Sequence, residues 1–186
     1  MPAGRTHDRI TFWTFPLILL IALDRTRSPW FTLVLTVGYL LGGFMLSPDL
    51  DIHSHPYKRW GWLRWIWLPY RASIRHRSPL SHAPIIGTTL RILYLTFWMG
   101  LMGIVGVAIT NDLLLGSLTW DKLDFIIRSF IRQHGKTGLF LIIGLELGAM
   151  SHSLADFSVT HYKRIKERGI CAILSKKSKH PRNRKR

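Results

Sequence analysis

Four long apolar blocks, in which charged residues are nearly absent, follow one another along the chain. They cover residues 10–23, 30–47, 84–109 and 138–157. A helix needs about 20 residues to cross the hydrocarbon core of a bilayer, and the last three blocks reach or approach that length. The first block is shorter and contains Pro16, which suits a tilted, mismatched or re-entrant helix. The pattern therefore predicts an all-α, polytopic integral membrane protein with about four transmembrane helices.

Polar segments divide and end these blocks. Residues 24–29 form a charged stretch that closes on a proline, and this predicts a turn that folds the first two helices into a hairpin. No small-residue cleavage site follows the first block, so we do not expect residues 1–11 to be a signal peptide. We expect a helical membrane domain over residues 1–160. A basic, disordered cytoplasmic tail is expected over residues 161–186.

Basic residues predict the orientation of the chain, whose net charge is +16. With four crossings, the N-terminus, the loop 48–83 and the tail share one side. That side carries 19 of the lysines and arginines, against 6 in the loops 24–29 and 110–137. Because lysine and arginine accumulate on the cytoplasmic side, both termini are expected in the cytoplasm.

Aromatic and basic residues alternate between Tyr57 and Trp67. Such a stretch is compatible with nucleic-acid stacking. Predicted spans flank it on both sides, and Trp and cationic side chains favour the headgroup layer, so a membrane-interface segment is the better interpretation. Membrane lipids are therefore the expected partners and nucleic acid is not, while the oligomeric state stays open. The lone Cys171 excludes an internal disulfide.

Histidines and acids gather in short motifs near the ends of the apolar blocks. The motifs are Thr6-His7-Asp8, Pro48-Asp49-Leu50-Asp51-Ile52-His53, His76-Arg77-Ser78, Leu80-Ser81-His82 and His152-Ser153-Leu154-Ala155-Asp156. With four crossings, all of these motifs fall on the same side of the membrane. His152 and Asp156 are four residues apart, which places both on one helix face. Each residue alone has an ordinary structural explanation, but jointly they predict a metal site.

Imidazole and carboxylate ligands without thiolate suit a divalent ion, Zn²⁺ first and Mn²⁺ or Fe²⁺ next, better than Ca²⁺. One ion would not use all the candidates, so two ions are a further option. The expected ligands are His7, Asp49, His76, His82, His152 and Asp156. Asp51 is a candidate proton acceptor or an orienter of a histidine. Arg77 is a candidate for stabilising the charge of a phosphate.

Two charged residues lie inside the predicted spans. Arg91 is near the start of the third block, and Glu146 lies at a similar depth in the fourth. An unpaired charge in hydrocarbon is costly. We therefore expect these two side chains to contact each other or to share a water, in a structural role.

The motifs together resemble those of the membrane-bound, metal-dependent hydrolase-like family that includes LexA-regulated inner-membrane proteins. The likeness rests on an early Thr-His, on Pro48-Asp49-Leu50-Asp51 after a glycine-rich span, on His76-Arg77-Ser78-Pro79-Leu80-Ser81-His82, and on the terminal His-x-x-x-Asp. It covers residues 5–157 and is closer still to a group of bacterial metal-binding membrane proteins. The resemblance implies a bound metal, hydrolysis and a multi-pass location in the bacterial inner (plasma) membrane.

The sequence therefore favours a metal-dependent hydrolase acting on an ester or phosphoester, including that of a lipid, at the cytoplasmic face. A non-catalytic metal-binding or transport protein is the first alternative, although a transporter places its ligands near the midplane. A membrane-anchored adaptor that binds lipid or nucleic acid through its tail is the second alternative.

Overall fold

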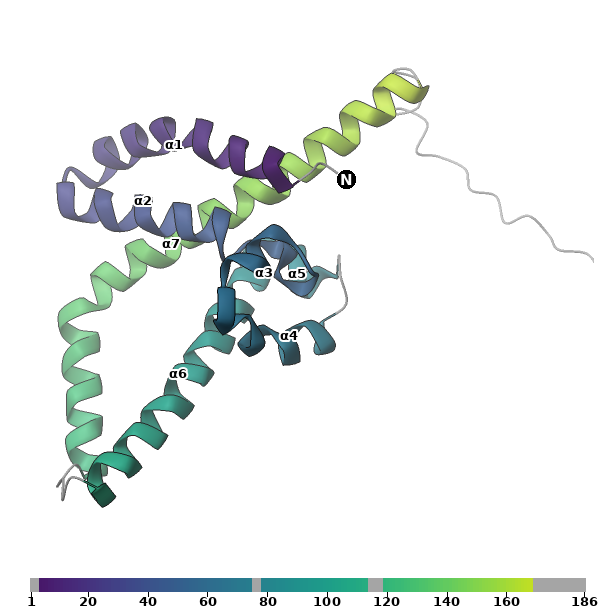
Figure 1. Ribbon diagram of the computed structural model, residues 1–186. Coiled ribbons are helices and arrows are strands. Elements are labelled where there is room, and N and C mark those ends of the chain that lie inside the picture. The colour runs from purple at the N-terminus through teal and green to yellow at the C-terminus, as the bar shows by residue number, and fades with distance from the viewer. Residues whose placement is uncertain (1–3, 75–77, 114–118, 169–186) are drawn as a thin grey trace, which may run out of the picture.

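The computed structural model describes residues 4–74, 78–113 and 119–168, and every regular element in these ranges is helical (Figure 1). The elements are α1 (Gly4–Thr26), α2 (Pro29–Phe44), η1 (Pro48–Asp51), α3 (His55–Arg59), η2 (Gly61–Ile66), α4 (Trp67–Ser73), α5 (Pro79–His82), α6 (Ile86–Leu113) and α7 (Trp120–Arg168), where η marks a 3-10 helix. The predicted all-α class is confirmed.

The four longer helices correspond, in order, to the four apolar blocks. Two stretches, Ile86–Asn111 in α6 and Trp120–Val159 in α7, are long and apolar enough to cross a membrane. The helix α2 is apolar but shorter, with 16 residues. The helix α1 has 23 residues and continues through Pro16, so it is longer than the apolar block that predicted it.

A tight turn joins α1 to α2, as the sequence predicted. Arg27 has a left-handed backbone (φ 48°), which reverses the chain between the two helices. The Thr26 hydroxyl bonds to that of Thr32 at 2.8 Å across the turn. Further along the hairpin, the Thr14 and Tyr39 hydroxyl groups lie 2.5 Å apart and tie α1 to α2. The helical hairpin is therefore confirmed.

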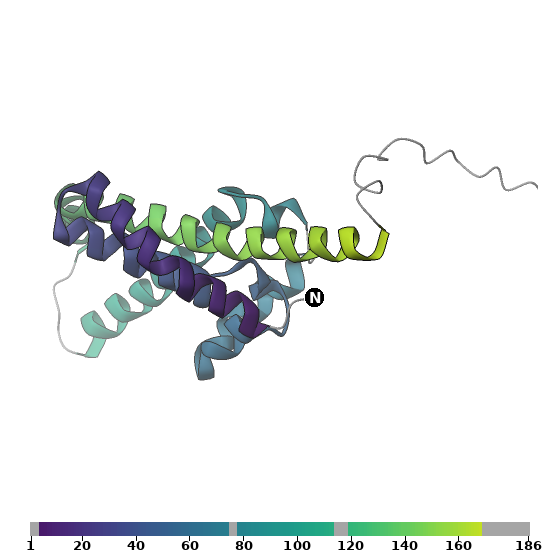
Figure 2. The same ribbon diagram turned by 90° about the horizontal axis from the view of Figure 1, so that it is seen from above.

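Glycines bring the backbones of α2 and α7 into close contact. Gly38 and Gly42 on α2 and Gly144 and Gly148 on α7 are each spaced by four residues, so each pair lies on one helix face. A Cβ at Gly144 would lie 2.1 Å from the Leu35 carbonyl oxygen, and the other three positions are equally crowded by backbone atoms. Small-residue stripes of this kind are typical of helix packing in membranes. In both Figure 1 and Figure 2, α1, α2 and the later part of α7 lie side by side.

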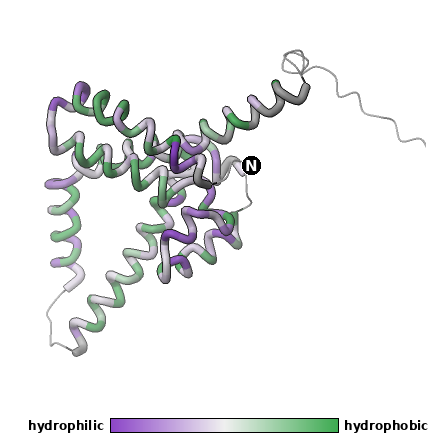
Figure 3. The backbone as a smooth tube through the Cα atoms, turned by 45° about the horizontal axis from the view of Figure 1, so that its top comes forward, coloured by the Kyte–Doolittle hydropathy of each residue, from purple (hydrophilic) through white to green (hydrophobic). Residues whose placement is uncertain are grey.

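The first part of α7 differs from the rest of that helix. It runs in a different direction from the later part of the same helix (Figure 1). Polar and apolar residues alternate along it, whereas α6 is largely apolar (Figure 3). Ile126 and Phe130 are exposed, and Asp124 pairs with Arg128 at 2.7 Å. The segment is therefore an amphipathic helix that precedes the apolar one.

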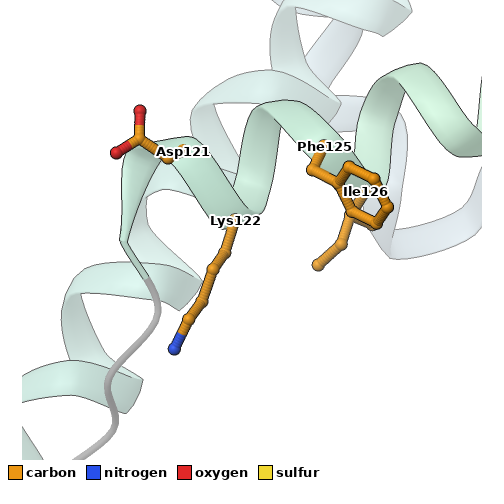
Figure 4. A pocket seen from close by; sticks show the side chains of 4 residues that line it. All are labelled: Asp121, Lys122, Phe125 and Ile126. Carbon is orange, nitrogen blue, oxygen red and sulfur yellow. The ribbon is translucent and has the colours of Figure 1, made fainter.

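A shallow apolar hollow lies beside the start of α7 (Figure 4). Its lining consists of Asp121, Lys122, Phe125 and Ile126, which all come from this one helix. Since no second element contributes to it, we treat it as part of the helix surface.

The segment between α2 and α6 folds into a small aromatic core. Leu50, Tyr57, Trp67 and Tyr70 are buried there, and Tyr94 of α6 packs against them. Two of the aromatic residues that were expected at a membrane interface, Tyr57 and Trp67, are thus core residues. Trp62 is 79% exposed and Trp65 44% exposed, so these two keep the interfacial interpretation.

The helix α7 extends to Arg168, through the first part of the predicted tail (residues 161–186). The remainder of that tail lies outside the described residues.

Candidate metal centre

Four separate elements bring histidines and acids together at one end of the α1–α2–α7 bundle. His7 lies in the first turns of α1, and His152 lies on α7. Asp49 belongs to η1, which Pro48 opens directly after α2. His82 ends α5, at the entrance to α6. The close packing of α2 on α7 thus places Asp49 beside His152.

The Nε2 atoms of two histidines converge on the Asp49 carboxylate. His152 Nε2 lies 3.2 Å from Asp49 Oδ2, and His82 Nε2 lies 3.8 Å from Asp49 Oδ1. His152 is 2% exposed, and the carboxylate is largely shielded from solvent. Two imidazole nitrogens therefore approach the two oxygens of one largely shielded carboxylate.

The donor set and its spacing fit a zinc-like cation. Zinc ligands lie about 2.0–2.2 Å from the ion in a tetrahedron, so neighbouring ligand atoms are about 3.4 Å apart. The 3.2 Å and 3.8 Å separations around Asp49 bracket that value. Within the described ranges, no group of three or more His, Cys, Asp or Glu side chains is placed so that it could hold a metal ion as it stands. The pairwise distances around Asp49 are compatible with a metal, whereas His82, His152 and Asp49 together do not form a preformed site.

His7 joins this cluster through its ring. It is 4% exposed, and its imidazole stacks on that of His152 with a centroid separation of 4.0 Å and an interplanar angle of 21°. Stacking fixes the plane of the His152 ring. His7 therefore belongs to the site, with a contact to His152 that the sequence did not predict.

The surroundings of Asp49 favour its charged form. Burial acts to raise the pKa of this carboxyl group, but the hydrogen bond with His152 opposes it. Electrostatic interaction with His152, His82 and His7 acts in the same direction as that bond. Together they hold the pKa of Asp49 below its ordinary value, so the carboxylate is available as a ligand at neutral pH.

Asp51 reaches the cluster through Ser81. The Ser81 hydroxyl is completely buried and donates to Asp51 Oδ2 at 2.5 Å. The same hydroxyl oxygen lies 3.0 Å from His82 Nδ1. When that Nδ1 carries the proton, His82 Nε2 is left as the metal-facing atom. These contacts connect Asp51 with the His82 ring, and both of its candidate roles stay predictions.

Several predicted residues lie outside what the structure describes. His76 and Arg77 belong to the undescribed segment 75–77. The backbone of Asp156 continues α7 one turn after His152, but its side chain is outside the described part. Their roles as ligands or as a phosphate-stabilising group therefore stay predictions.

Arg91 and Glu146 line the same small cavity, which also borders His82. Arg91 is 1% exposed and donates to the Ser81 carbonyl oxygen and to the Thr88 hydroxyl, both at 3.1 Å. Glu146 accepts a hydrogen bond from the Ile85 backbone N–H at 2.8 Å. The expected direct contact between Arg91 and Glu146 is not seen: no hydrogen bond or ion pair joins these two described residues, and each has other polar partners. The shared water stays a prediction, since both residues border the same cavity.

Other residues that support the site have only weak signals in the sequence. Ser81 was visible only as the neighbour of His82. Arg59 bonds both carboxylate oxygens of Asp8, at 3.0 and 2.6 Å, and also the Phe44 carbonyl oxygen at 3.0 Å. The Arg59 side chain thereby connects α3 with the start of α1, next to His7. An exposed arginine in a basic loop gives no sign of such a contact before folding.

Comparison with known proteins agrees with this geometry. Residues 2–166 match the model of a family described as uncharacterized metal-binding protein (DUF2227). The chain belongs to this family. The match covers every residue of the cluster, so the DUF2227 description and the convergence of imidazoles on Asp49 point to the same property.

A relative supports the assignment to DUF2227. An uncharacterized protein of Aquifex aeolicus (strain VF5) is 35% identical over 131 residues, which cover 69% of this chain and 91% of that protein. No solved structure matches this chain.

Proposed function

We propose that this chain is a membrane-embedded protein that binds a divalent metal ion, zinc first, with His82, His152 and Asp49 as its central ligands. The observation that carries the proposal is the convergence of two Nε2 atoms, from the buried His152 and the partly buried His82, on one carboxylate from three separate elements. His7, His76 and Asp156 are the further candidate ligands. Zinc, manganese and iron are the candidate ions because the proposed ligands are imidazole and carboxylate groups.

The membrane part of the proposal is that α1, α2, α6 and the later part of α7 each cross the bilayer. Large apolar side chains such as Leu17 on α1 and Leu33 on α2 are exposed, as lipid-facing residues are. The glycine-mediated contact of α2 with α7 supports the same conclusion. Four crossings place His7, Asp49, His82 and His152 on one side, which agrees with their meeting in one cluster. By the charge asymmetry, that side is cytoplasmic, in the inner membrane of a bacterium.

The finer proposal is hydrolysis of an ester or phosphoester, including that of a lipid, at this face. When bound, a divalent cation polarises an ester or phosphoryl oxygen and makes water available as a nucleophile at neutral pH. The chain's own part is to orient the ligands: Asp51 acts through Ser81 on His82, and His7 holds the ring of His152. Arg77 is proposed to stabilise the charge of a phosphate.

Metal content tests the first part of the proposal. Protein purified in detergent is loaded with zinc, manganese or iron, dialysed, and its metal measured by elemental analysis. We expect bound metal in the wild type and its loss in His152→Ala. His134→Ala is the matched control, because His134 is an exposed histidine on the same helix, packed on Phe130 outside the cluster. Equal metal in all three proteins, or none in the wild type, would refute the site.

Turnover tests the finer part. The metal-loaded protein is assayed against phosphomonoesters, phosphodiesters, phospholipids and carboxyl esters. Hydrolysis that disappears in His152→Ala supports an enzyme. Absence of turnover across this panel by a protein that holds its metal would replace the hydrolase proposal with metal binding alone.

A further inference from the structure

The loop that carries His82 into α6 contains a strained residue. Ile85 has φ 67°, in the left-handed region that a β-branched side chain rarely adopts. Its side chain is 69% exposed, so packing of the side chain does not hold it there. A strained residue of this kind persists only where its surroundings impose the conformation.

The Glu146 carboxylate restrains this residue from another helix, in addition to the local backbone bond from the Thr89 N–H to the Ile85 carbonyl oxygen at 2.8 Å. Its Oε1 accepts the Ile85 backbone N–H at 2.8 Å, across a sequence separation of 61 residues. The helix α6 diverges from the later part of α7 soon after its first turns (Figure 1). The bond therefore acts where the α6 entrance and α7 are still close, between His82 and His152.

We infer that Glu146 is a positioning residue that clasps the strained 83–85 loop onto α7, so that His82 and His152 meet on Asp49. The inference rests on the proposed metal site, and it assigns the acid a role beyond balancing the charge of Arg91. Without the clasp, Ile85 relaxes to an ordinary backbone conformation. His82, three residues earlier, then moves out of register with Asp49.

The role needs a hydrogen-bond acceptor and does not need a negative charge. A glutamine at position 146 keeps a carbonyl oxygen that accepts the Ile85 N–H, whereas it removes the charge near Arg91. If Glu146 acts as a hydrogen-bond acceptor for Ile85, Glu146→Gln should preserve its role. If it balances the charge of Arg91, Glu146→Gln should lose that role. Glycine at position 85 adopts a positive φ without strain, so it should reduce the dependence on the clasp.

Metal affinity of the full chain in detergent, measured by competition with a zinc chelator dye, separates these roles. We expect Glu146→Ala to weaken zinc binding roughly tenfold, equivalent to about 1.4 kcal/mol, and Glu146→Gln to remain within about twofold of wild type. The double variant Glu146→Ala/Ile85→Gly should recover most of the loss. Ile86→Gly, one residue beyond the strained position, is the control and should bind zinc as wild type does.

A distance measurement makes the clasp testable apart from the metal. In a Cys171→Ser background, spin labels at Ile86 and Leu154, both exposed, report the separation of the α6 entrance from α7. We expect a narrow distance distribution with Glu146 or glutamine at position 146, and a broadened or shifted one with alanine, in metal-free protein. If wild type binds no zinc but this distance responds as described, the metal proposal fails and the clasp stands.

Two results would overturn the inference. One is a Glu146→Gln variant as defective as Glu146→Ala and not recovered by Ile85→Gly, which would assign Glu146 to charge balance with Arg91. The other is an unchanged distance distribution in folded Glu146→Ala, with thermal unfolding of each variant used to establish that it is folded.

Discussion

The Nε2 atom of His152, on α7, lies 3.2 Å from Oδ2 of Asp49, which follows α2 in the chain. The two residues are about a hundred positions apart in sequence, and the glycine-lined contact of α2 with α7 is what brings them together. Asp49 also faces His82, so one carboxylate connects both imidazoles. Loss of Asp49 should therefore affect the site more than loss of any single histidine contact.

Asp49→Ala should abolish or strongly weaken metal binding. Changing a partner that only orients a ligand already costs about 10–100-fold in metal affinity or activity, and loss of a ligand itself should act directly on the affinity. Zinc titration of the purified protein measures the effect. Asp24→Ala, at an exposed position in the last turn of α1, should bind zinc normally. Wild-type affinity in Asp49→Ala would contradict the proposed centre.

Asp51→Asn should keep the metal and lower turnover, if the protein is a hydrolase. The amide preserves the size of the side chain but weakens the hydrogen bond with the Ser81 hydroxyl. The orientation of the His82 ring, which contacts that hydroxyl, is then less well fixed. Ser81→Ala removes the same connection and should produce a similar defect. Metal content and the rate of hydrolysis are measured on the same preparations. An unaltered rate in both variants would exclude this orienting role.

Gly148→Ala should destabilise the fold. The added Cβ would lie 2.1 Å from the Tyr39 carbonyl oxygen, so α2 and α7 would have to separate. Overpacking of this kind costs about 1–3 kcal/mol, and thermal unfolding in detergent should show a lower midpoint. Gly103→Ala is the control, because a Cβ there meets nothing within 4 Å and alanine favours the helix. Equal midpoints for the two variants would refute a tight α2–α7 interface.

Cysteines at positions 62 and 120 should label from opposite sides of the membrane. Both tryptophans are highly exposed, and the four-span topology places the first in the cytoplasmic loop and the second in the external one. The test uses a Cys171→Ser background, intact cells and a membrane-impermeant thiol reagent. Only position 120 should react from outside. Labelling of both positions from outside would overturn the proposed orientation.

The sequence by itself determined the all-α class and the hairpin of α1 with α2, and it predicted the residues among which the cluster is found. Apolar blocks fix helices through local length and composition, and the predicted four crossings assigned His7, Asp49, His82 and His152 to one side before any contact was known. These features depend on patterns between residues that are close in sequence, and such patterns can be read from one amino-acid sequence.

Only the tertiary structure decided which of those residues touch. The stacking of His7 on His152, the connection from Asp51 through Ser81 to His82, and the bond from Ile85 to Glu146 each join segments that are distant in sequence. Each depends on how closely two backbones approach, as at Gly144 against Leu35, and on the left-handed turn at Ile85. The conformational propensity of a single residue does not favour such close approach or local strain. Both therefore arise from the packing of the whole chain.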